Sequence, residues 1–441
     1  MRRARRVPEL LFAAWGVALC SLTVGAVAQD HAEAAVWSSP VLPLTVGRLA
    51  GATAGLVLMA QLVLAARPRA LERRFGIDGL LRAHAVGGVL LLAVIVMHVG
   101  LLVLGGAGAT GLASPSYALH LATQSAPLLA ASAGLALLAV LWSSTAWRTL
   151  RRRRRGVWHV LHLSGYGAIA LIVPHQVLTG AEFAGRPLLS AAWVASWAAA
   201  LGIAALERVV RPLALARANP LTVTENRSEA PGIASLVLTA PSALPLEPGG
   251  YVLLGTSCWR RHPFSVVDVL DERTFRCTVE GVGPFTRRLL QASPGDRLVV
   301  TGLHGRFTAC SAVTGGPYLL VAAGLGVTAV RGLLAGLLRA GHGADVVLLY
   351  RVRTRGPVLF ADDLAAARSR GVDVRVLRGS RHAPVLRADR AADIAALVPD
   401  AAAREWFVCG PEGYMRAVRS AARGLGVPRA RVHAERFTLG R

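Results

Sequence analysis

The stretch that decides the fold is Leu81-Arg-Ala-His84-Ala-Val-Gly-Gly-Val-Leu-Leu-Leu-Ala-Val-Ile-Val-Met-His98-Val-Gly-Leu-Leu-Val-Leu104. It is long and apolar enough to cross a bilayer as one helix, which takes about 20 apolar residues. At ~1.5 Å of rise per residue, His84 and His98 lie ~21 Å apart along that helix, so we expect one histidine near each face of the membrane. Ionisable side chains inside a spanning helix indicate a functional site.

Apolar runs of this length recur through the first half of the chain. The chain has 441 residues, of which 54% are hydrophobic, and its mean hydropathy is +0.48. Soluble domains are usually about 45–50% apolar, so an ordinary cytosolic protein is excluded. For the first run, a signal peptide is the alternative to a membrane span, because arginines precede it. The expected spans are Leu10–Ala28, Leu44–Ala66, Leu81–Leu104, Ala126–Trp147, Val157–Thr179 and Leu188–Val210.

Arginine is distributed unevenly over the loops between these spans. The 49 basic residues are all arginines and face 25 acidic residues, for a net charge of +24. They cluster at the N-terminus, in Arg67–Arg82 and in Arg148–Arg155, and the intervening loops are nearly free of them. The positive-inside rule therefore predicts a cell-membrane protein with six spans and both termini in the cytoplasm. We interpret Arg151–Arg155 as a topology determinant beside membrane lipid, and we expect no nucleic-acid partner.

The fifth expected span carries a second histidine pair, His162 and His175, ~20 Å apart along the helix. Because spans three and five run in the same direction, His84 and His162 fall near the cytoplasmic face, and His98 and His175 near the outer face. Two facing imidazoles at each of two depths suit two bis-histidine b-type haems.

Three neighbours of these histidines bear on that interpretation. His159 is an alternative to His162 at the inner level. Pro174 is expected to kink span five and so re-aim His175. Arg48, near the outer end of span two, either extends to the lipid headgroups or contacts an outer haem propionate or a bound acceptor.

The second half of the chain changes character twice. Short strands between Gly/Pro turns first predict a small antiparallel barrel. Strands that alternate with helices then predict a parallel, doubly wound α/β sheet. We expect domains at 1–212, 213–312 and 313–441. The expected strands are Leu221–Glu225, Ile233–Thr239, Tyr251–Leu254, Phe264–Val269, Phe275–Val279 and Arg297–Thr301 for the barrel, and Tyr318–Ala322, Val346–Tyr350, Val372–Leu377 and Trp406–Cys409 for the sheet.

Two short motifs follow strands of the expected sheet. Gly324-Leu-Gly326-Val-Thr328 precedes an expected helix at Val330–Arg339, and its glycines would let the backbone approach a pyrophosphate. A structural glycine-rich turn is the alternative. Cys409-Gly410-Pro411 lies at the carboxyl edge, where such sheets bind ligands. The five cysteines form no CxxC pair, so no local framework for an iron–sulfur or zinc site is evident.

Taken in order along the chain, these features resemble the ferric reductase and NADPH oxidase superfamily of transmembrane flavocytochromes. The resemblance implies that the haem ligands are His84, His98, His162 and His175. The flavin signature of that superfamily matches His262-Pro263-Phe264-Ser265, with Phe264 and Ser265 against the isoalloxazine. The resemblance also implies that His262 and Gly283-Pro-Phe285-Thr286-Arg287 hold the ribityl and pyrophosphate groups of the flavin cofactor. In the barrel-closing pattern Gly302-Leu303-His304-Gly305-Arg-Phe307, leucine replaces the usual proline.

The nucleotide motif of the superfamily resembles Ala323-Gly324-Leu-Gly326-Val-Thr328-Ala329, with alanine in place of its first glycine and of its proline. The resemblance implies that the nicotinamide lies near Cys409 and Ser265. Arg351, Arg353 and Arg381 follow strands where related proteins select the 2′-phosphate of NADPH, and a solvated surface role is the alternative. Glu435-Arg-Phe437 matches the terminal glutamate and aromatic residue, with Phe437 shielding the flavin.

The function that this resemblance implies is transmembrane electron transfer from NADPH or NADH through FAD and two haems to a ferric chelate or dioxygen. The oxidase branch commonly adds a second outer histidine where this chain has Leu102, whereas Arg48 resembles the partner arginine of that branch. One alternative is a membrane diaphorase that donates electrons to a protein partner. A second is a transporter with a regulatory nucleotide domain, whose histidines would relay protons.

Overall fold

The computed structural model describes residues 42–147, 155–180, 183, 185–258, 260–305, 307–353, 356–379 and 389–435. The chain divides into two compact units: the helical unit, Met1–Arg208, and the barrel–sheet unit, Val209–Arg441. The first expected span, Leu10–Ala28, lies outside the described residues.

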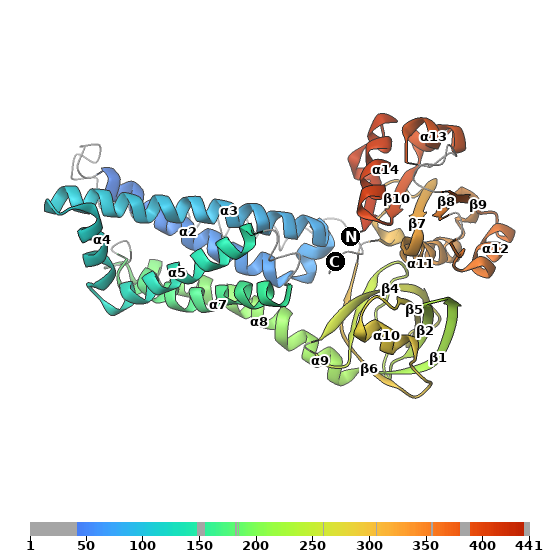
Figure 1. The fold of residues 1–441 in the computed structure, drawn as a ribbon, viewed down its shortest axis with the longest axis horizontal. Helices are drawn as coiled ribbons and strands as arrows, with labels where there is room; N and C mark the ends of the chain where they lie inside the picture. Colours follow the sequence, from blue (N-terminus) through green and yellow to red (C-terminus); the bar gives the residue numbers. More distant parts are fainter. Residues whose placement is uncertain are drawn as a thin grey trace. The chain divides into compact units, whose positions relative to one another are not determined.

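Long apolar helices make up the described part of the helical unit (Figure 1). The expected spans two to six all coincide with helices long and apolar enough to cross a membrane, which confirms a membrane protein. A short helix at Ser114–Thr123, between expected spans three and four, was not expected from the sequence. The helices are α2 (Leu42–Ala66), α3 (Arg69–Thr110), α4 (Ser114–Thr123), α5 (Ala126–Ala146), α7 (Arg155–Leu178) and α8 (Pro187–Ala205), which continues through the π-helical turn η2 (Leu206–Val210).

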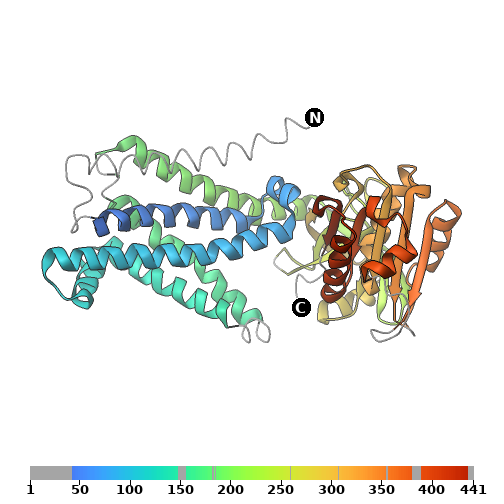
Figure 2. The same ribbon diagram turned by 90° about the horizontal axis from the view of Figure 1, so that it is seen from above.

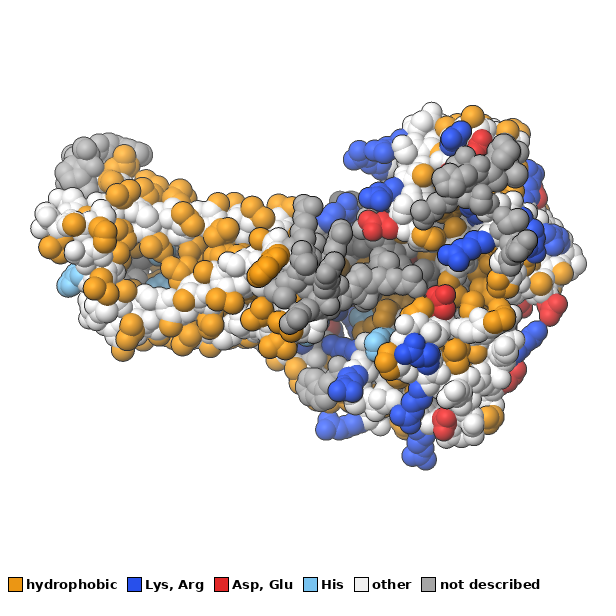
Figure 3. Space-filling model, viewed as in Figure 1, with side chains coloured by type: hydrophobic (Ala, Val, Ile, Leu, Met, Phe, Trp, Pro, Cys, Tyr) orange, Lys and Arg blue, Asp and Glu red, His pale blue; other side chains and the backbone are white. Residues whose placement is uncertain are grey.

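The spanning helices pack in pairs. Helix α3 lies along α2, as Figures 1 and 2 show from two directions, and α5 lies along α7. Within the described residues, α3 and α7 make little direct backbone contact, and both carry predicted histidines. Hydrophobic side chains cover the visible face of this unit, whereas most of the charged side chains visible in Figure 3 belong to the barrel–sheet unit. An exposed apolar surface of this extent is suited to lipid.

The barrel–sheet unit begins with a helix and a closed antiparallel barrel. The strand order is β1-β2-β5-β4-β3-β6, which leaves no free edge and confirms the predicted barrel. Alternate residues fill its interior, for example Leu236, Leu238 and Phe275, which are fully buried. The elements are α9 (Arg211–Ala218), β1 (Pro220–Ala230), β2 (Ile233–Thr239), β3 (Tyr251–Gly255), β4 (Arg261–Val269), β5 (Thr274–Glu280), α10 (Pro284–Leu290) and β6 (Arg297–His304).

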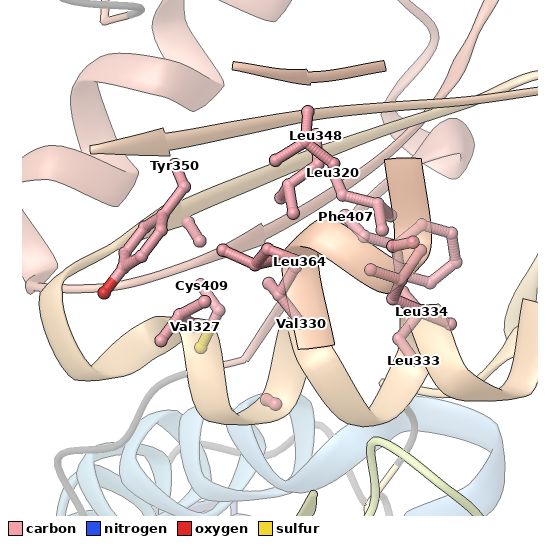
Figure 4. Packing of buried hydrophobic residues seen from close by; sticks show 14 of the residues in the cluster. Leu320, Val327, Val330, Leu333, Leu334, Leu348, Tyr350, Leu364, Phe407 and Cys409 are labelled. Carbon is pink, nitrogen blue, oxygen red and sulfur yellow. The ribbon is translucent and has the colours of Figure 1, made fainter. Parts of the chain in front are cut away.

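A parallel sheet of order β11-β10-β7-β8-β9 follows, as predicted, with one further strand at the edge beside β10. Helices cover both faces. Figure 4 shows Val327, Val330, Leu333 and Leu334 of one helix packed against the sheet. The elements are β7 (Tyr318–Ala323), η4 (Gly324–Gly326), α11 (Val327–Arg339), β8 (Val346–Val352), α12 (Ala361–Ser369), β9 (Asp373–Arg378), α13 (Ala391–Leu397), β10 (Glu405–Cys409), α14 (Glu412–Gly424) and β11 (Val432–Glu435).

Candidate functional site

One histidine pair meets between α3 and α7. The ring centres of His84 and His162 are 6.0 Å apart and their planes cross at 70°. Two imidazoles that share one metal through bonds of ~2 Å each hold their ring centres about 6 Å apart, so the observed separation fits a single metal between them. Both Nδ1 atoms are buried and lack a hydrogen-bond partner in the structure. Trp158 stacks on His162 at 4.9 Å, and His159 is exposed.

The other two predicted histidines have their rings oriented by backbone carbonyls. His98 Nδ1 lies 2.7 Å from the carbonyl oxygen of Gly47 on α2. His175 Nδ1 is hydrogen-bonded to the carbonyl oxygen of Ile172. Because a carbonyl only accepts, each Nδ1 carries the proton and each Nε2 keeps a lone pair for a metal. A Cβ at Gly51 would lie 2.5 Å from the ring of His98, so only glycine leaves room for that imidazole.

The sequence did not reveal the polar support beside His175. The side-chain oxygen of Gln176 accepts hydrogen bonds from the indole N–H groups of Trp193 and Trp197, each at 3.0 Å. These bonds join α7 to α8, where both indoles are buried. Figure 3 shows a small hollow in the visible face of this unit with histidine side-chain atoms inside it.

The described residues contain no group of three or more His, Cys, Asp or Glu side chains that could hold a metal ion. The donors that the described residues do bring together are two imidazoles, those of His84 and His162. Arg48 is half-buried and directly follows Gly47, the residue whose carbonyl orients His98.

The predicted flavin residues gather between β4 and α10. Phe264 and Ser265 of β4 are buried, and His262 stacks on Phe285 with ring centres 4.8 Å apart. Pro263 lies between His262 and Phe264 on β4. The hydroxyl of Thr286 accepts a hydrogen bond of 2.9 Å from the backbone N–H of Gly283, which shapes the start of α10. Arg287 follows in that helix.

A tyrosine that the sequence did not single out extends this site. Tyr251 of β3 lies directly opposite Ser265 of β4 and opposite His304 of β6. Its ring stacks on His304 with centres 5.4 Å apart. Leu303, the residue that departs from the usual barrel-closing pattern, still pairs with Val252 of β3, and the register between the two strands shifts between Leu253 and Leu254.

The two predicted nucleotide motifs touch each other. A Cβ at Gly326 would lie 2.3 Å from the carbonyl oxygen of Cys409, so the loop reaches this point only as glycine. Gly410 lies close to Ala323, where a Cβ would come within 3.0 Å of the Ala323 side chain, a tighter contact than is usual but less close than the one at Gly326. Gly324 adopts a φ of 55°, which favours glycine.

The helix after this loop starts earlier than expected, at Val327. The hydroxyl of Thr328 donates to the carbonyl oxygen of Leu325 at 2.9 Å, which satisfies a side chain buried in the first turn. Pro411 similarly lies next to the first residue of α14, where its missing N–H costs no helical hydrogen bond.

Cys409 lies at the carboxyl edge of the sheet, as predicted, and is fully buried beside Val327 (Figure 4). It pairs with Glu435 of β11, and its thiol donates to the carbonyl oxygen of Glu435 at 3.4 Å. Burial, and then the nearby Glu435 carboxylate, raise the pKa of the Cys409 thiol well above its ordinary value. The thiol is therefore neutral at physiological pH. Phe437 lies outside the described residues.

The arginines after the strands differ in their surroundings. Arg351 at the end of β8 pairs with Asp389 at 3.6 Å and lies over the ring of Tyr414, 5.6 Å from its centre. Arg353 is exposed. Arg381 lies outside the described residues. Of the three predicted arginines, Arg353 is thus described as accessible to solvent, whereas Arg351 is committed to protein contacts.

The barrel and the sheet are joined through α11, which packs on β4. A Cβ at Gly332 would lie 2.2 Å from the carbonyl oxygen of Val266 and 2.5 Å from the backbone nitrogen of Gly249. Around this contact, Arg331 bridges Asp268 of β4 at 2.9 Å and Asp363 of α12 at 3.2 Å. The strand with the predicted flavin residues is therefore held directly against the helix that follows the nucleotide loop.

A buried carboxylate supports the far end of the sheet. Glu405 accepts hydrogen bonds from the N–H groups of Val313 and Thr314, from the Thr314 hydroxyl and from His433 Nε2 at 2.6–3.0 Å. Burial raises the pKa of this carboxyl, but the bonds from Thr314, His433 and Val313 outweigh burial and hold it below its ordinary value. His433 also stacks on Phe407 at 4.5 Å. A lone glutamate in an apolar strand was the only sequence signal.

Comparison with known proteins gives two kinds of match. The family model of the ferric reductase like transmembrane component matches residues 50–173. The chain is 35% identical over 176 residues to ferredoxin–NADP reductase B of Sorangium cellulosum (strain So ce56), covering 36% of this chain and 69% of that relative. It is 30% identical over 211 residues to NADH oxidoreductase HCR of Escherichia coli (strain K12), covering 46% of this chain and 63% of that relative.

Among solved structures, the chain is similar to the flavohem-like FAD/NAD-binding domain of nitric oxide dioxygenase from Vibrio cholerae O1 biovar El Tor. The sequence identity is 22% and the TM-score is 0.41, with 50% of this chain and 98% of that one covered. The chain spans less than two thirds of the length of several curated relatives, for example 63% of the Escherichia coli protein.

Proposed function

Because this chain belongs to the superfamily of ferric reductase- and NADPH oxidase-like flavocytochromes, we propose that it transfers electrons from cytosolic NAD(P)H, through FAD and two b-type haems, to an acceptor at the outer face of the membrane. A ferric-reductase-like transmembrane part joined to a ferredoxin-reductase-like unit makes it a membrane oxidoreductase of the NAD(P)H/FAD reductase class. The proposed acceptor is a ferric chelate or dioxygen.

The observation that carries the proposal is the inner histidine pair, whose ring centres are 6.0 Å apart across two helices that make little other contact. His84 and His162 would hold the inner haem, and His98 and His175 the outer one. A haem bound to two imidazoles takes up and releases single electrons at its iron. The protein contributes the apolar helices that exclude water and the carbonyls of Gly47 and Ile172 that orient the outer ligands.

In the barrel–sheet unit, the buried Phe264 and Ser265 would line the flavin ring, and the Ser265 hydroxyl would hydrogen-bond its reactive edge. FAD converts a two-electron hydride transfer into one-electron steps. The stacked pair His262 and Phe285, with Pro263, would lie beside the flavin. Gly283, Thr286 and Arg287 would hold the phosphates at the start of α10, because a guanidinium matches phosphate oxygens.

The nucleotide would lie along the loop of Gly324 and Gly326, with Thr328 fixing the helix start and Gly410 and Pro411 forming the facing turn. Cys409 and Glu435 would flank the nicotinamide, and the neutral Cys409 thiol adds no negative charge beside the transferred hydride. Phe437 would cover the flavin. Arg353 and Arg381 would bind the 2′-phosphate of NADPH.

Histidine variants of the purified full chain test this function. We expect a Soret band and two haems per FAD in the parent chain, and loss of one haem in His84→Ala and in His98→Ala. His159→Ala is the matched control, because His159 is exposed on the same helix as His162 and should leave the haem content unchanged. A parent chain without a Soret band, or a His98→Ala chain with full haem content, contradicts the proposal.

A second experiment identifies the acceptor. Proteoliposomes that contain the chain are supplied with NADPH on the cytoplasmic side, and ferric-chelate reduction and superoxide release are measured on the other side. Ferric-chelate reduction without superoxide indicates a reductase, and the reverse indicates an oxidase. Haem reduction with neither product contradicts both proposed acceptors and favours a protein acceptor.

A further inference from the structure

An amide group is buried in the membrane part without a partner. Gln61 lies on α2 with only 7% of its surface exposed, and its side-chain oxygen Oε1 has no hydrogen-bond partner in the structure. Burying an amide among apolar side chains without a hydrogen bond is costly, so such a group calls for a compensating contact.

The packing of α2 on α3 places this amide on the face of the inner histidine. A Cβ at Gly87 would lie 2.0 Å from Gln61 Nε2, so the amide occupies the space that the missing side chain of Gly87 leaves. Gly87 is three residues after His84, and residues three apart lie on the same helix face. His84 also lies next to the backbone carbonyl of Gln61.

His84 also has a buried ring nitrogen without a hydrogen-bond partner. Its Nδ1 is buried and has no hydrogen-bond partner, as is the case for Gln61 Oε1. Gln61 Oε1 accepts a hydrogen bond, and His84 Nδ1 donates one when it carries the proton. A rotation of the Gln61 side chain that brings Oε1 to His84 Nδ1 would satisfy both atoms.

The outer end of the same two helices already shows this arrangement. There, His98 of α3 uses Nδ1 to bond the carbonyl oxygen of Gly47 on α2 at 2.7 Å. The bond fixes the proton on Nδ1 and leaves Nε2 for a metal. At the inner end, α2 presents to His84 both the backbone carbonyl and the side-chain amide of Gln61.

We propose that Gln61 is a positioning residue for His84, accepting the Nδ1–H hydrogen bond through Oε1 and presenting the bare Nε2 to the inner haem iron. This inference rests on the proposed function, because it assigns His84 as a haem ligand. Partners of this kind orient a ligating imidazole and increase its basicity, and their loss typically weakens the metal site about 10–100-fold.

Three variants of the full chain test the assignment. Gln61→Leu keeps the approximate side-chain size and removes the acceptor, and Gln61→Glu replaces the acceptor with an anionic one. Gln176→Leu is the matched control, because it removes the other buried amide beside a proposed ligand, at the outer level. Haem content, an optical redox titration that resolves the two haems, and the electron paramagnetic resonance spectrum of each ferric haem are measured.

For Gln61→Leu we expect inner-haem affinity to fall about 10–100-fold, the inner-haem potential to rise and its resonance to shift, while the outer haem is unchanged. For Gln61→Glu we expect both haems to be retained and the inner potential to fall, because an anionic acceptor makes the imidazole a stronger donor to ferric iron. Gln176→Leu should leave the inner haem as in the parent. NADPH–ferricyanide activity reports that the barrel–sheet unit is folded in every variant.

Two results overturn the assignment. The first is an inner haem whose affinity, potential and resonance in Gln61→Leu match the parent. The second is loss of the inner haem in Gln61→Glu with retention in Gln61→Leu, which means that the amide donates to a cofactor anion. If Gln61→Leu does not fold, the direction of the potential shift in Gln61→Glu decides alone. A parent chain without haem refutes the proposed function instead.

Discussion

The same methyl group, added at three points along one segment, should have three different effects. Gly336 and Gly332 lie within α11, and Gly326 lies just before it. A Cβ at Gly336 would meet Pro248 at 3.8 Å, an ordinary contact, whereas at Gly332 it would lie 2.2 Å from a β4 carbonyl oxygen. At Gly326 it would lie 2.3 Å from the carbonyl oxygen of Cys409.

The magnitudes follow from these distances. Gly336→Ala should stabilise the barrel–sheet unit by about 1 kcal/mol, because alanine is the better helix former. For a unit of this size that corresponds to a rise of about 2–4 °C in Tm. Gly332→Ala gains the same propensity, but overpacking against backbone costs about 1–3 kcal/mol or more, so its Tm should fall below that of Gly336→Ala by several degrees.

The functional effect of Gly332→Ala should exceed its effect on stability. To restore normal contact, α11 must move about 1 Å away from β4, the strand with Phe264 and Ser265. A misplacement of about 1 Å between reacting groups can cost about 100-fold in rate. Gly326→Ala shifts the nucleotide loop itself and should mainly raise the KM for NADPH.

The assays are thermal unfolding monitored by release of flavin fluorescence, and stopped-flow reduction of the flavin by NADPH. The Gly336→Ala chain is the control for both. If Gly332→Ala reduces its flavin as fast as Gly336→Ala and unfolds at the same temperature, the close contact of α11 with β4 does not set the hydride-transfer geometry.

Three further predictions concern single side chains. Glu405→Gln should destabilise the barrel–sheet unit by about 3 kcal/mol in urea unfolding, because it weakens a buried set of charge-assisted bonds, whereas the exposed Glu272→Gln should not. Because folding lowers the pKa of Glu405, its contribution to stability is complete above the ordinary pKa value of 4.5 and is lost as the pH falls through and below that value. The parent and Glu405→Gln should therefore converge in stability in acid, and parallel pH profiles would contradict this. Arg353→Ala should raise the KM for NADPH about tenfold and leave that for NADH unchanged, and equal effects on both cofactors would remove Arg353 from the 2′-phosphate site. Iodoacetamide should label the half-buried Cys258 in the native chain and spare Cys409 and Cys277, with peptide masses as the readout, because burial raises the pKa of both spared thiols, that of Cys277 to about 12. Native labelling of Cys409 would refute its burial as a neutral thiol.

The elements that the sequence predicted well are those with a strong, local pattern. The spanning helices are uninterrupted apolar runs, and the barrel and sheet strands lie between Gly/Pro turns. The sequence therefore predicted which segments are helices and which are strands. The edge strand β11, by contrast, is a short polar segment that becomes a strand only because β10 supplies its partner. Helix α4 is similarly defined by its place between α3 and α5.

The site divides in the same way. The histidine spacing, together with the shared direction of spans three and five, indicated that His84 and His162 lie at one depth. The flavin and nucleotide motifs could be recognised as short sequence motifs. The contact of Gly326 with Cys409 joins segments over eighty residues apart, and no local pattern encodes it. Gln61 and Glu405 were missed because each is a single polar residue in an apolar element, and what makes each one notable is its burial.

The proposed function requires that electrons from NADPH reach two haems in this chain. The direct measurement is anaerobic optical spectroscopy of the full chain in nanodiscs, with haem and FAD quantified in the same sample. We predict two haems per FAD, both reduced after NADPH is added, and a His98→Ala chain in which only the inner haem is reduced. A chain that binds FAD and oxidises NADPH with ferricyanide, but holds no haem or leaves its haem oxidised, would contradict electron transfer from NADPH to haem in this protein.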